Sequence, residues 1–408
     1  MHTTILLPQD ANKKFVYERK RQLKLEILRF LYKNGKQSIP DLSGYLEHST
    51  PTITRAVESL IDEDNLVINL GEGASKGGRR PNYYGLNPEA KYVLALDISR
   101  YYTKICLYDF VCNPKIEVKT INEGFETTND ILSFIKVEVN KYLSDSKINT
   151  DKIVGAGIAI PGLINIKTGM SYSYLKEDEP AHVIFKELLN FPAFVINDTK
   201  AMTLSELYFG KANGKKNVLY LTVGSGVGLG IIVNGKLYHG TSGYTGEFGH
   251  IQVQPDGKLC RCGKIGCLET VASGRVLIEN IISELSNGSD SIIRNLVNND
   301  LSLIDANIVT EAARKGDFFS IQKLAEIGER LGQGITTLIH LFNPEMIIIG
   351  GDLGVAGNFI TDPIQHSINK YALQKIKRDA HIVASEIGEN TTLMGAYANT
   401  MNAIFNVS

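Results

Sequence analysis

The sequence has few cysteines, no long apolar run and almost no net charge, and each scarcity excludes a class of protein. Five cysteines among 408 residues are too few for a disulfide-stabilised scaffold and fit a reducing cytoplasm. Near the start, the apolar run Ile5–Leu7 is too short for a signal peptide, and no stretch approaches the roughly 20 apolar residues that cross a bilayer. The net charge of −1 indicates no partner for the whole chain. We therefore expect a soluble, cytoplasmic protein with no membrane partner and roughly two or three domains.

Three of those five cysteines lie together in the segment 260–267, which reads Cys-Arg-Cys-Gly-Lys-Ile-Gly-Cys, and His250 precedes it. One imidazole and three thiolates complete the shell of a structural zinc ion and leave no open position for a reactive water. Gly263 and Gly266 let the backbone wrap around an ion. The alternative is three buried or idle cysteines beside an unrelated histidine. The clustering favours structural zinc, bound by His250, Cys260, Cys262 and Cys267.

Basic and helical patterns dominate the first ninety residues. Between residues 13 and 33, eight cations stand against two acids, and apolar residues at helical spacing predict a helix from about Arg19 to Asn34. A second helix is predicted from Ser38, with Asp41 completing a capping box, and a third from Pro51. The apolar face of the third helix is Ile53, Ala56, Val57, Leu60 and Ile61. Three short helices with a tight second turn are typical of a helix-turn-helix.

A basic loop between two predicted strands follows these helices. The strands are Leu66–Leu70 and Tyr83–Leu86, and the glycine-rich loop between them contains Arg79 and Arg80. Glycines allow the backbone to approach a duplex, and the arginines can reach phosphates or the narrow minor groove. A small helical domain with a solvated basic face would account for the helices alone, whereas this wing favours DNA. Residues 1–88 are thus predicted to form a winged helix-turn-helix that binds double-stranded DNA.

Candidate DNA contacts lie at the start of the third helix and in the wing. The helix start is where side chains of such domains meet base edges. Arg55 could instead pair with Glu58 or with a phosphate, so the sequence predicts phosphate and groove contacts but no particular base. The predicted DNA-binding residues are Thr50, Thr52, Thr54, Arg55, Arg79 and Arg80.

Short apolar strands replace the basic pattern after residue 88. Strands, a helix and a further strand are predicted up to residue 160, and a similar order of elements recurs from residue 217. This recurrence predicts two related α/β lobes with a cleft between them. The predicted strands are 92–98, 103–109, 115–121 and 153–160 in the first set, and 217–223, 228–233, 236–238 and 346–349 in the second.

Polar residues stand where several apolar runs end. Asn197 and Asp198 end one run, Glu247 and His250 lie in a glycine-flanked segment, and Glu269 follows the cysteine cluster. Each of these singly is more often a cap or a surface acid. Together they could bind the hydroxyls of a sugar, because a metal loop would hold His250 and Glu269 rigidly. A glycine-rich loop at 224–230 could meet a phosphate or form a tight strand turn, and the hairpin after it excludes a dinucleotide fingerprint.

At these motifs the chain resembles the ROK family of repressors, open reading frames and kinases. The most specific segments are Gly246–His250 and Cys260–Glu269, and Pro161-Gly162 and Asn197-Asp198 fall at the expected places. The N-terminal module and the segment Gly77–Pro81 resemble the repressor branch, which includes N-acetylglucosamine and xylose repressors. The resemblance covers almost the whole chain after about residue 18.

The resemblance implies an α/β, two-lobed fold of the actin-like ATPase and ribonuclease H type. Residues 89–197 would form the first lobe, with the C-terminal helix 391–408 packing back on it. Residues 198–390 would form the second lobe, with the zinc loop and a dimerisation surface. Asp198 matches the general base of the kinase members. The implied sugar contacts are Gly162, Asn197, Asp198, Glu247, His250 and Glu269.

One departure from the kinase pattern bears on activity. Kinase members have a glycine-rich turn after the first strand, whereas this chain has the bulky residues Arg100, Tyr101 and Tyr102 there. Such side chains should obstruct the close approach of ATP phosphates. The loop 224–230 and Asp198 are retained, so residual phosphoryl transfer stays open. A second departure, in residues 171–179, leaves the identity of the effector open.

The sequence thus predicts a sugar-responsive regulator, not an enzyme, that represses carbohydrate-utilisation genes. A homodimer or homotetramer would place winged helices on a palindromic operator. A sugar or sugar phosphate bound between the lobes would alter the spacing of the DNA-binding heads. The alternatives are an ATP-dependent sugar kinase that carries a DNA-binding head, and a regulator whose effector is a partner protein.

Overall fold

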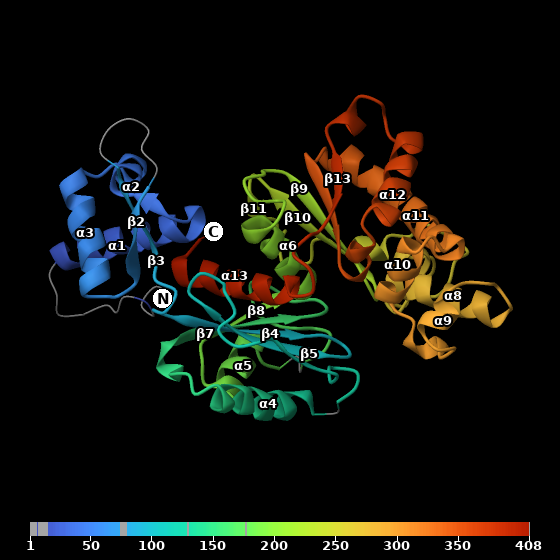
Figure 1. The fold of residues 1–408 in the computed structure, drawn as a ribbon, viewed down its shortest axis with the longest axis horizontal. Helices are drawn as coiled ribbons and strands as arrows, with labels where there is room; N and C mark the ends of the chain where they lie inside the picture. The colour runs from blue at the N-terminus through green and yellow to red at the C-terminus, as the bar shows by residue number, and fades with distance from the viewer. Residues whose placement is uncertain (1–5, 7–14, 74–79, 129, 176–177, 408) are drawn as a thin grey trace. The chain divides into compact units, whose positions relative to one another are not determined.

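A computed structural model describes residues 6, 15–73, 80–128, 130–175 and 178–407 of the chain (Figure 1). These residues form two compact units, each of which contains a five-stranded sheet. As far as they are described, Met1–Ile164, Thr168–Ala201 and Thr392–Ser408 belong to unit 1, and Asn165–Lys167 and Met202–Thr391 belong to unit 2. No helix in the described ranges is both long and apolar enough to cross a membrane.

The N-terminal part of unit 1 is a three-helix head with a small antiparallel sheet. Ser38 caps the second helix, and its reciprocal bonds with Asp41 form the capping box that the sequence predicts. Leu28, Leu42 and Ile53, one from each helix, are fully buried and make the centre of the head. The elements are α1 (Phe15–Asn34), α2 (Ile39–Leu46), α3 (Thr50–Asp62) and a sheet in the order β1 (Gln37–Ser38), β3 (Asn82–Leu86) and β2 (Val67–Glu72).

The head differs from the sequence expectation in detail. Helix α1 begins at Phe15, earlier than the expected Arg19. Strand β1 is not predicted because two residues that pair with Tyr83 and Tyr84 carry no alternation pattern. Within α3, Ala56 and Ile61 are only half-buried, so the buried stripe is narrower than the apolar spacing suggests.

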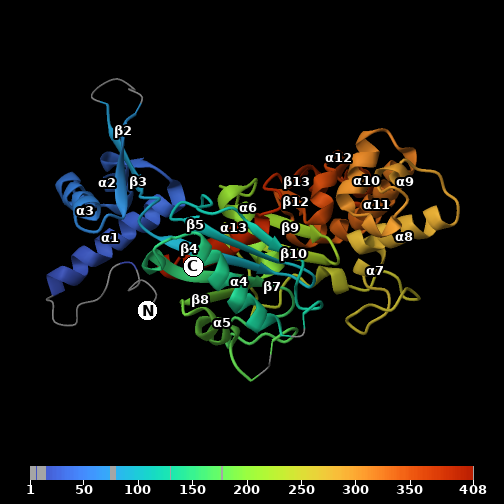
Figure 2. The same ribbon diagram turned by 60° about the horizontal axis from the view of Figure 1, so that its bottom comes forward.

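The second part of unit 1 is a mixed sheet with helices on both faces (Figures 1 and 2). Three antiparallel strands are followed by two that run parallel to the first of them. Strand β6 covers only the end of the predicted range 115–121, because Pro114 and the bends after it interrupt pairing. The sheet order is β6 (Lys119–Ile121), β5 (Thr103–Asp109), β4 (Tyr92–Ile98), β7 (Ile153–Ile160) and β8 (Ala193–Asn197). Its helices are α4 (Ile131–Asp145), α5 (Ala181–Leu189) and α13 (Thr391–Phe405).

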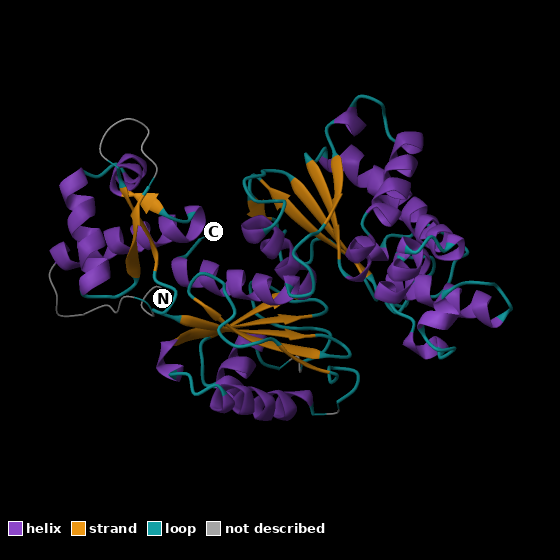
Figure 3. Cartoon of the chain, viewed as in Figure 1, coloured by secondary structure: helices purple, strands orange, loops and turns teal. Residues whose placement is uncertain are grey.

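Unit 2 repeats the same strand arrangement (Figure 3). Its sheet order is β11 (Lys236–Leu237), β10 (Val227–Val233), β9 (Val218–Val223), β12 (Met346–Gly350) and β13 (His381–Ala384). The recurrence of element order in the sequence therefore reflects two sheets of one topology. The helices are α6 (Asp198–Phe209), whose first four residues belong to unit 1, α7 (Glu269–Ala272), α8 (Gly274–Ser286), α9 (Ile293–Leu296), α10 (Ala306–Arg314), α11 (Phe318–Phe342) and α12 (Asn358–Tyr371).

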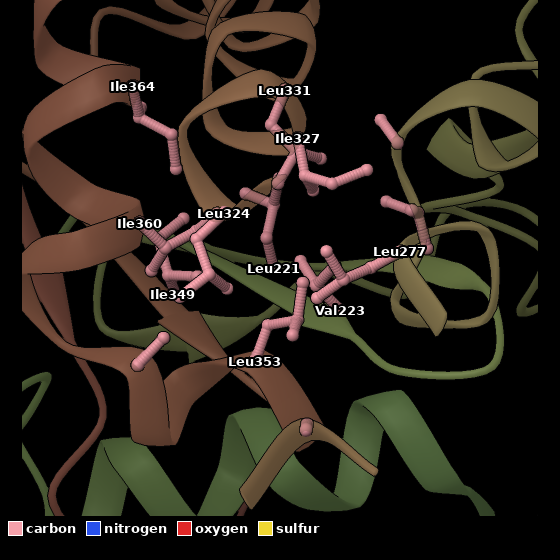
Figure 4. Packing of buried hydrophobic residues seen from close by; sticks show 14 of the residues in the cluster. Leu221, Val223, Leu277, Leu324, Ile327, Leu331, Ile349, Leu353, Ile360 and Ile364 are labelled. Atoms are coloured by element: carbon pink, nitrogen blue, oxygen red, sulfur yellow. The ribbon is translucent and has the colours of Figure 1, made fainter. Parts of the chain in front are cut away.

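The main core of unit 2 lies between its sheet and the helices that follow the cysteine-rich segment 260–267. Leu221 and Ile349 from the central strands meet Leu277, Ile327 and Ile360 from three helices (Figure 4). All five side chains are buried. Leu268 and Ala272 belong to the same core, which anchors the short helix α7 that begins at Glu269.

Candidate functional site

The cysteine cluster and the distant histidine come together in unit 2. One ligand atom each from His250, Cys260, Cys262 and Cys267 lies within 4.8 Å of all the others. The Sγ atoms of Cys262 and Cys267 are 3.7 Å apart, and Cys260 Sγ lies 3.6 Å from His250 Nδ1. The four side chains could therefore hold a metal ion, as their spacing in the sequence predicts.

The backbone around these ligands is a tight loop. Cys260 N–H donates to Lys264 O at 2.7 Å, and Gly266 N–H donates to Lys258 O at 2.9 Å. Gly266 has φ +74°, and a Cβ there would meet Gln254 O at 1.6 Å. Only glycine fits that close approach, so the sequence fixes the loop shape as well as its ligands.

Two carboxylates flank the imidazole of His250. Glu247 Oε2 lies 3.9 Å from Nε2, and Glu269 Oε1 lies 3.9 Å from Nδ1. Glu269 also accepts from the Cys260 thiol at 3.0 Å and is buried at the start of α7. The predicted unit 2 sugar residues thus gather beside the four candidate metal ligands, and His250 belongs to both groups.

The predicted unit 1 sugar residues also gather, at the ends of β7 and β8. Asn197 Nδ2 donates to Gly162 O at 3.1 Å and to Asp198 Oδ1 at 2.9 Å. The same Asp198 oxygen accepts from Thr199 N–H at 2.6 Å, at the first turn of α6. Gly162 has φ +84°, and a Cβ there would lie 2.2 Å from Ser173 Oγ. Amide, carboxylate and carbonyl groups thus meet within unit 1, as hydroxyl recognition requires.

A buried carboxylate, Asp97, stands at the end of β4 near the half-buried Asp198. Burial, and then the charge of Asp198, raise the pKa of Asp97 to about 7. The Thr392 hydroxyl and Tyr102, whose oxygen is 3.5 Å away, bond to Asp97 and oppose that rise. Burial also raises the pKa of Asp198, against the Thr199 N–H and the charge of Arg100. The sequence patterns alone do not single out Asp97 as a site residue.

The raised pKa of Asp97 predicts a pH-dependent stability of unit 1. Between pH 4 and pH 7 the folded chain keeps a proton that the unfolded chain releases, so stability falls as pH rises through this window. The loss is complete above about pH 7 and amounts to about 4 kcal/mol at most. Asp97→Asn cannot ionise, and we expect calorimetry to find a smaller fall in Tm between pH 5 and pH 8. The exposed control Asp151→Asn should keep the wild-type slope, and an equal slope in Asp97→Asn would contradict the assignment.

The turn after β4 is closed by its own backbone. Ser99 N–H donates to Tyr102 O at 2.9 Å, and Ser99 Oγ accepts from the N–H groups of Tyr101 and Tyr102. Residues 224–226 of the glycine-rich segment form a tight hairpin turn between β9 and β10, where Val223 pairs with Val227, and Gly228 and Gly230 lie within β10. A Cβ at Gly230 would lie 1.7 Å from Thr203 Oγ1, so packing alone requires glycine there.

The predicted DNA contacts lie on an exposed face of the head. Thr50, Thr52 and Arg55 are exposed, and Thr54 is half-buried with its hydroxyl bonded to Thr50 O at 2.9 Å. Within the described residues Arg55 forms no ion pair with Glu58. Arg80 is exposed beside β3, and Arg79 lies outside the described residues.

A family match accounts for these groupings. The sequence profile of the ROK family matches residues 93–402. The chain belongs to the ROK family. The fold is that of this family, α/β with N-terminal helices and two actin-like lobes that each contain a sheet.

Relatives of this ROK protein include regulators and kinases. A xylose repressor from Caldicellulosiruptor bescii is 28% identical over 378 residues, which are 92% of this chain and 94% of the repressor. A crystal structure of a ROK family transcriptional regulator, a homolog of the E. coli MLC protein, has a TM-score of 0.77 and 27% identity, over 95% of this chain and 97% of that chain. A ROK glucokinase from Streptomyces griseus, in complex with glucose and AMPPNP, has a TM-score of 0.67 and 27% identity, over 75% of this chain and 97% of its own.

In the sequence of this ROK chain, Asp97 and Arg100 stand out only as parts of an altered turn, and Glu126 and Thr392 do not stand out at all. From segments far apart in the chain, the structure brings Asp97 and Arg100 near Asp198, Glu126 to Arg100, and Thr392 to Asp97. A carboxylate at the end of a fully buried strand is the available signal for Asp97. Glu126 and Thr392 carry no local pattern that sets them apart.

Proposed function

We propose that this ROK chain is a sugar-responsive transcriptional repressor. One observation carries the proposal: the likeness to repressor-type relatives extends through the three-helix head. The xylose repressor and the MLC homolog cover more than nine-tenths of the chain, whereas the glucokinase covers three-quarters of it. The two α/β lobes are thus shared with kinases, whereas the three-helix head is shared only with the regulators in this comparison. This difference favours a cytoplasmic protein whose head binds DNA.

We assign DNA recognition to the start of α3 and to the wing. Three exposed side chains there, Thr50, Thr52 and Arg55, carry hydroxyl and guanidinium groups that suit phosphates and base edges. Thr54 and Arg79 are assigned by position, and exposed Arg80 extends the cationic surface. A homodimer or homotetramer would set two heads on half-sites about one helical turn apart.

The wing predicts a measurable salt dependence. Replacing Arg79 and Arg80 together by alanine should weaken binding to fragments from upstream of the chain's own gene. The slope of log K against log salt should flatten by roughly 0.9 for each phosphate that the wing no longer neutralises. Fluorescence anisotropy at several salt concentrations measures this slope. Lys315→Ala, which removes an exposed cation from unit 2, should leave the slope unchanged, and an unaltered slope in the double arginine variant would refute the wing contact.

We propose structural zinc as the ion of the unit 2 cluster. In a tetrahedral site with Zn–S near 2.3 Å, sulfurs lie about 3.8 Å apart, and a sulfur and an imidazole nitrogen about 3.6 Å. The distances of 3.7 and 3.6 Å fit these values. Burial raises the pKa of the Cys260 thiol, so a thiolate there needs an adjacent cation. His250, Cys260, Cys262 and Cys267 would hold the ion, whose contribution is to fix the loop.

We assign effector contacts to both polar sets, each argued within its own unit. In unit 1 they are Gly162, Asn197 and Asp198, which already share hydrogen bonds. In unit 2 they are Glu247, His250 and Glu269, which the metal loop holds. A carboxylate accepts from sugar hydroxyls and an amide both donates and accepts, so these groups can fix several hydroxyls. A coupling of roughly 1–3 kcal/mol between effector and operator would give a useful switch.

Removal of Glu247 tests the effector assignment. Its side chain is half exposed and lies outside the apolar core, so Glu247→Ala should fold and bind DNA. We expect sugars that release or strengthen DNA binding in the wild type to have at least tenfold less effect on this variant. Glu311→Ala, a surface acid of α10, is the control and should respond normally. A normal response in Glu247→Ala would remove this residue from the site.

Sugar phosphorylation is the second candidate function, favoured by the retained Asp198. A coupled assay with ATP and a panel of hexoses tests it. Rapid turnover that is lost in Asp198→Asn would establish a kinase with a DNA-binding head. Absence of turnover together with operator binding supports the repressor.

A further inference from the structure

Arg100 interacts with two carboxylates of unit 1. Its Nε lies 3.8 Å from Glu126 Oε1, and its positive charge also acts on Asp198. Arg100 is about one-third exposed, so it faces the polar set without being free in solvent. The guanidinium thus stands just after β4, paired with Glu126, and its charge reaches Asp198.

A rigid frame fixes this position. Phe125 N–H donates to Ser99 O at 3.1 Å, and Glu126 N–H donates to Arg100 O at 2.7 Å. A Cβ on Gly124 would come within 2.6 Å of the Arg100 backbone, so only glycine permits the two segments to lie this close. The turn that carries Arg100 is therefore clamped to the segment that carries its partner.

The frame also joins the two segments in which the sequence departs from the kinase pattern. Tyr174 comes from the second of them, and its hydroxyl donates to Glu126 Oε1 at 3.4 Å. Its ring stacks on Phe125 with centroids 4.8 Å apart. Arg100, Glu126 and Tyr174 thus form one chain of contacts, so the two departures are parts of a single structural change.

The charges around Asp198 leave little room for another anion. Among the described interactions, Arg100 pairs with Glu126 and its charge acts on Asp198, while the charges of Asp198 and Lys104 act on Asp97. The charge of Arg100 is already shared by two acids, and Lys104 acts on Asp97. A dianionic phosphate would therefore add negative charge beside carboxylates that range from exposed Glu126 to buried Asp97, while Arg100 and Lys104 already act on these acids.

We propose that Arg100 is a specificity-determining residue: an internal counter-ion that makes the unit 1 site accept an uncharged sugar and reject the corresponding sugar phosphate. The inference rests on the proposed function, because it assumes that the effector binds at Asn197 and Asp198. It narrows the effector to the unphosphorylated class. Glu126 is the positioning residue, because it forms an ion pair with the guanidinium of Arg100.

Matched pairs of ligands test the proposal. Thermal shift and isothermal titration at pH 7.5 would compare glucose with glucose 6-phosphate, and N-acetylglucosamine with its 6-phosphate, with xylose as a further uncharged sugar. We expect the wild type to bind one or more uncharged sugars at least tenfold more tightly than any phosphate. A phosphate that binds as tightly or more tightly overturns the inference and leaves a sugar-responsive regulator intact. If no sugar and no phosphate binds, the proposed function fails and the inference fails with it.

Variants of Glu126 and Tyr174 separate the effect of the Glu126 charge from the effect of losing a hydrogen bond. Glu126→Gln removes the acid that occupies Arg100, so the ratio of phosphate to sugar affinity should rise at least tenfold. Tyr174→Phe is the matched control, because it removes a hydrogen bond to Glu126 and no charge, and its ratio should stay near the wild-type value. A ratio that is unchanged in Glu126→Gln, or raised equally in both variants, would refute the counter-ion role. Arg100→Gln should weaken binding of the uncharged sugar. If the Arg100→Gln variant does not fold, the affinity ratio of Glu126→Gln alone decides whether Arg100 acts as the counter-ion.

Discussion

Cys262→Ser is expected to release the bound metal and to lower the Tm of the protein by roughly 6–12 °C. Cys262 is the exposed member of a four-ligand set, so serine causes little packing loss of its own. Its effect would come through the ion, because three remaining ligands do not complete a structural site. We expect the free energy of unfolding to fall by about 3 kcal/mol. This is well below the metal-binding energy that folds isolated zinc peptides, because backbone hydrogen bonds already order the loop.

Metal analysis and calorimetry on the same preparations measure both effects. Wild-type protein should contain one equivalent of zinc, and Cys262→Ser should contain almost none. Cys112→Ser is the control, because Cys112 lies in unit 1 outside the cluster and its replacement should leave the metal content unchanged. Zinc-free wild-type protein that is fully folded would contradict the site, as would a Cys262→Ser variant that retains its metal.

Loss of the ion should also reach the effector residues of unit 2. Glu269 follows the ligand Cys267 by two residues, and its Oε1 lies 3.9 Å from His250 Nδ1, so its position depends on the loop. A change at the metal ligands should therefore also displace the proposed effector contacts. We expect Cys262→Ser to lose its sugar response at a temperature at which the head still binds DNA.

The features that the sequence predicts are those whose signal is local. Four ligands within eighteen residues, the capping box at Ser38 and the glycine at position 266 each need only near neighbours. The structure confirms the ligand cluster, the capping box and the repeated sheet order. The proposed roles of these residues remain predictions for experiment.

The features that the sequence does not predict arise from contacts between distant segments. Strand β13 has four residues at a sheet edge and no buried run, so it exists only because β12 offers a partner. Arg100 meets Glu126 and Tyr174 through backbone pairing and a glycine contact that no spacing rule describes. The raised pKa of Asp97 likewise depends on Asp198, which lies in another strand–helix connection.

Helix α13 links the polar set of unit 1 with the three-helix head, to which we assign DNA binding. Near its start, Thr392 bonds Asp97, and at its end Arg29 of α1 donates to the carbonyl of Phe405. The Phe405 ring is fully buried, with Tyr32 of α1 at 5.2 Å and Phe110 at 6.1 Å between centroids. Fifteen helical residues span about 22 Å, so one rigid element reaches both places.

We therefore expect Phe405→Ala to destabilise unit 1 by about 3–5 kcal/mol, the usual cost of removing a buried phenyl ring. The cavity would lie where α13 meets α1, so operator binding should persist while its response to sugar falls several-fold. Chemical denaturation measures the first effect, and operator affinity with and without sugar measures the second. Asn406→Gly is the matched control, because this exposed residue has φ +53° and glycine accepts that backbone. A destabilised Phe405→Ala that keeps the full sugar response would show that α13 supports the head without transmitting the signal to it.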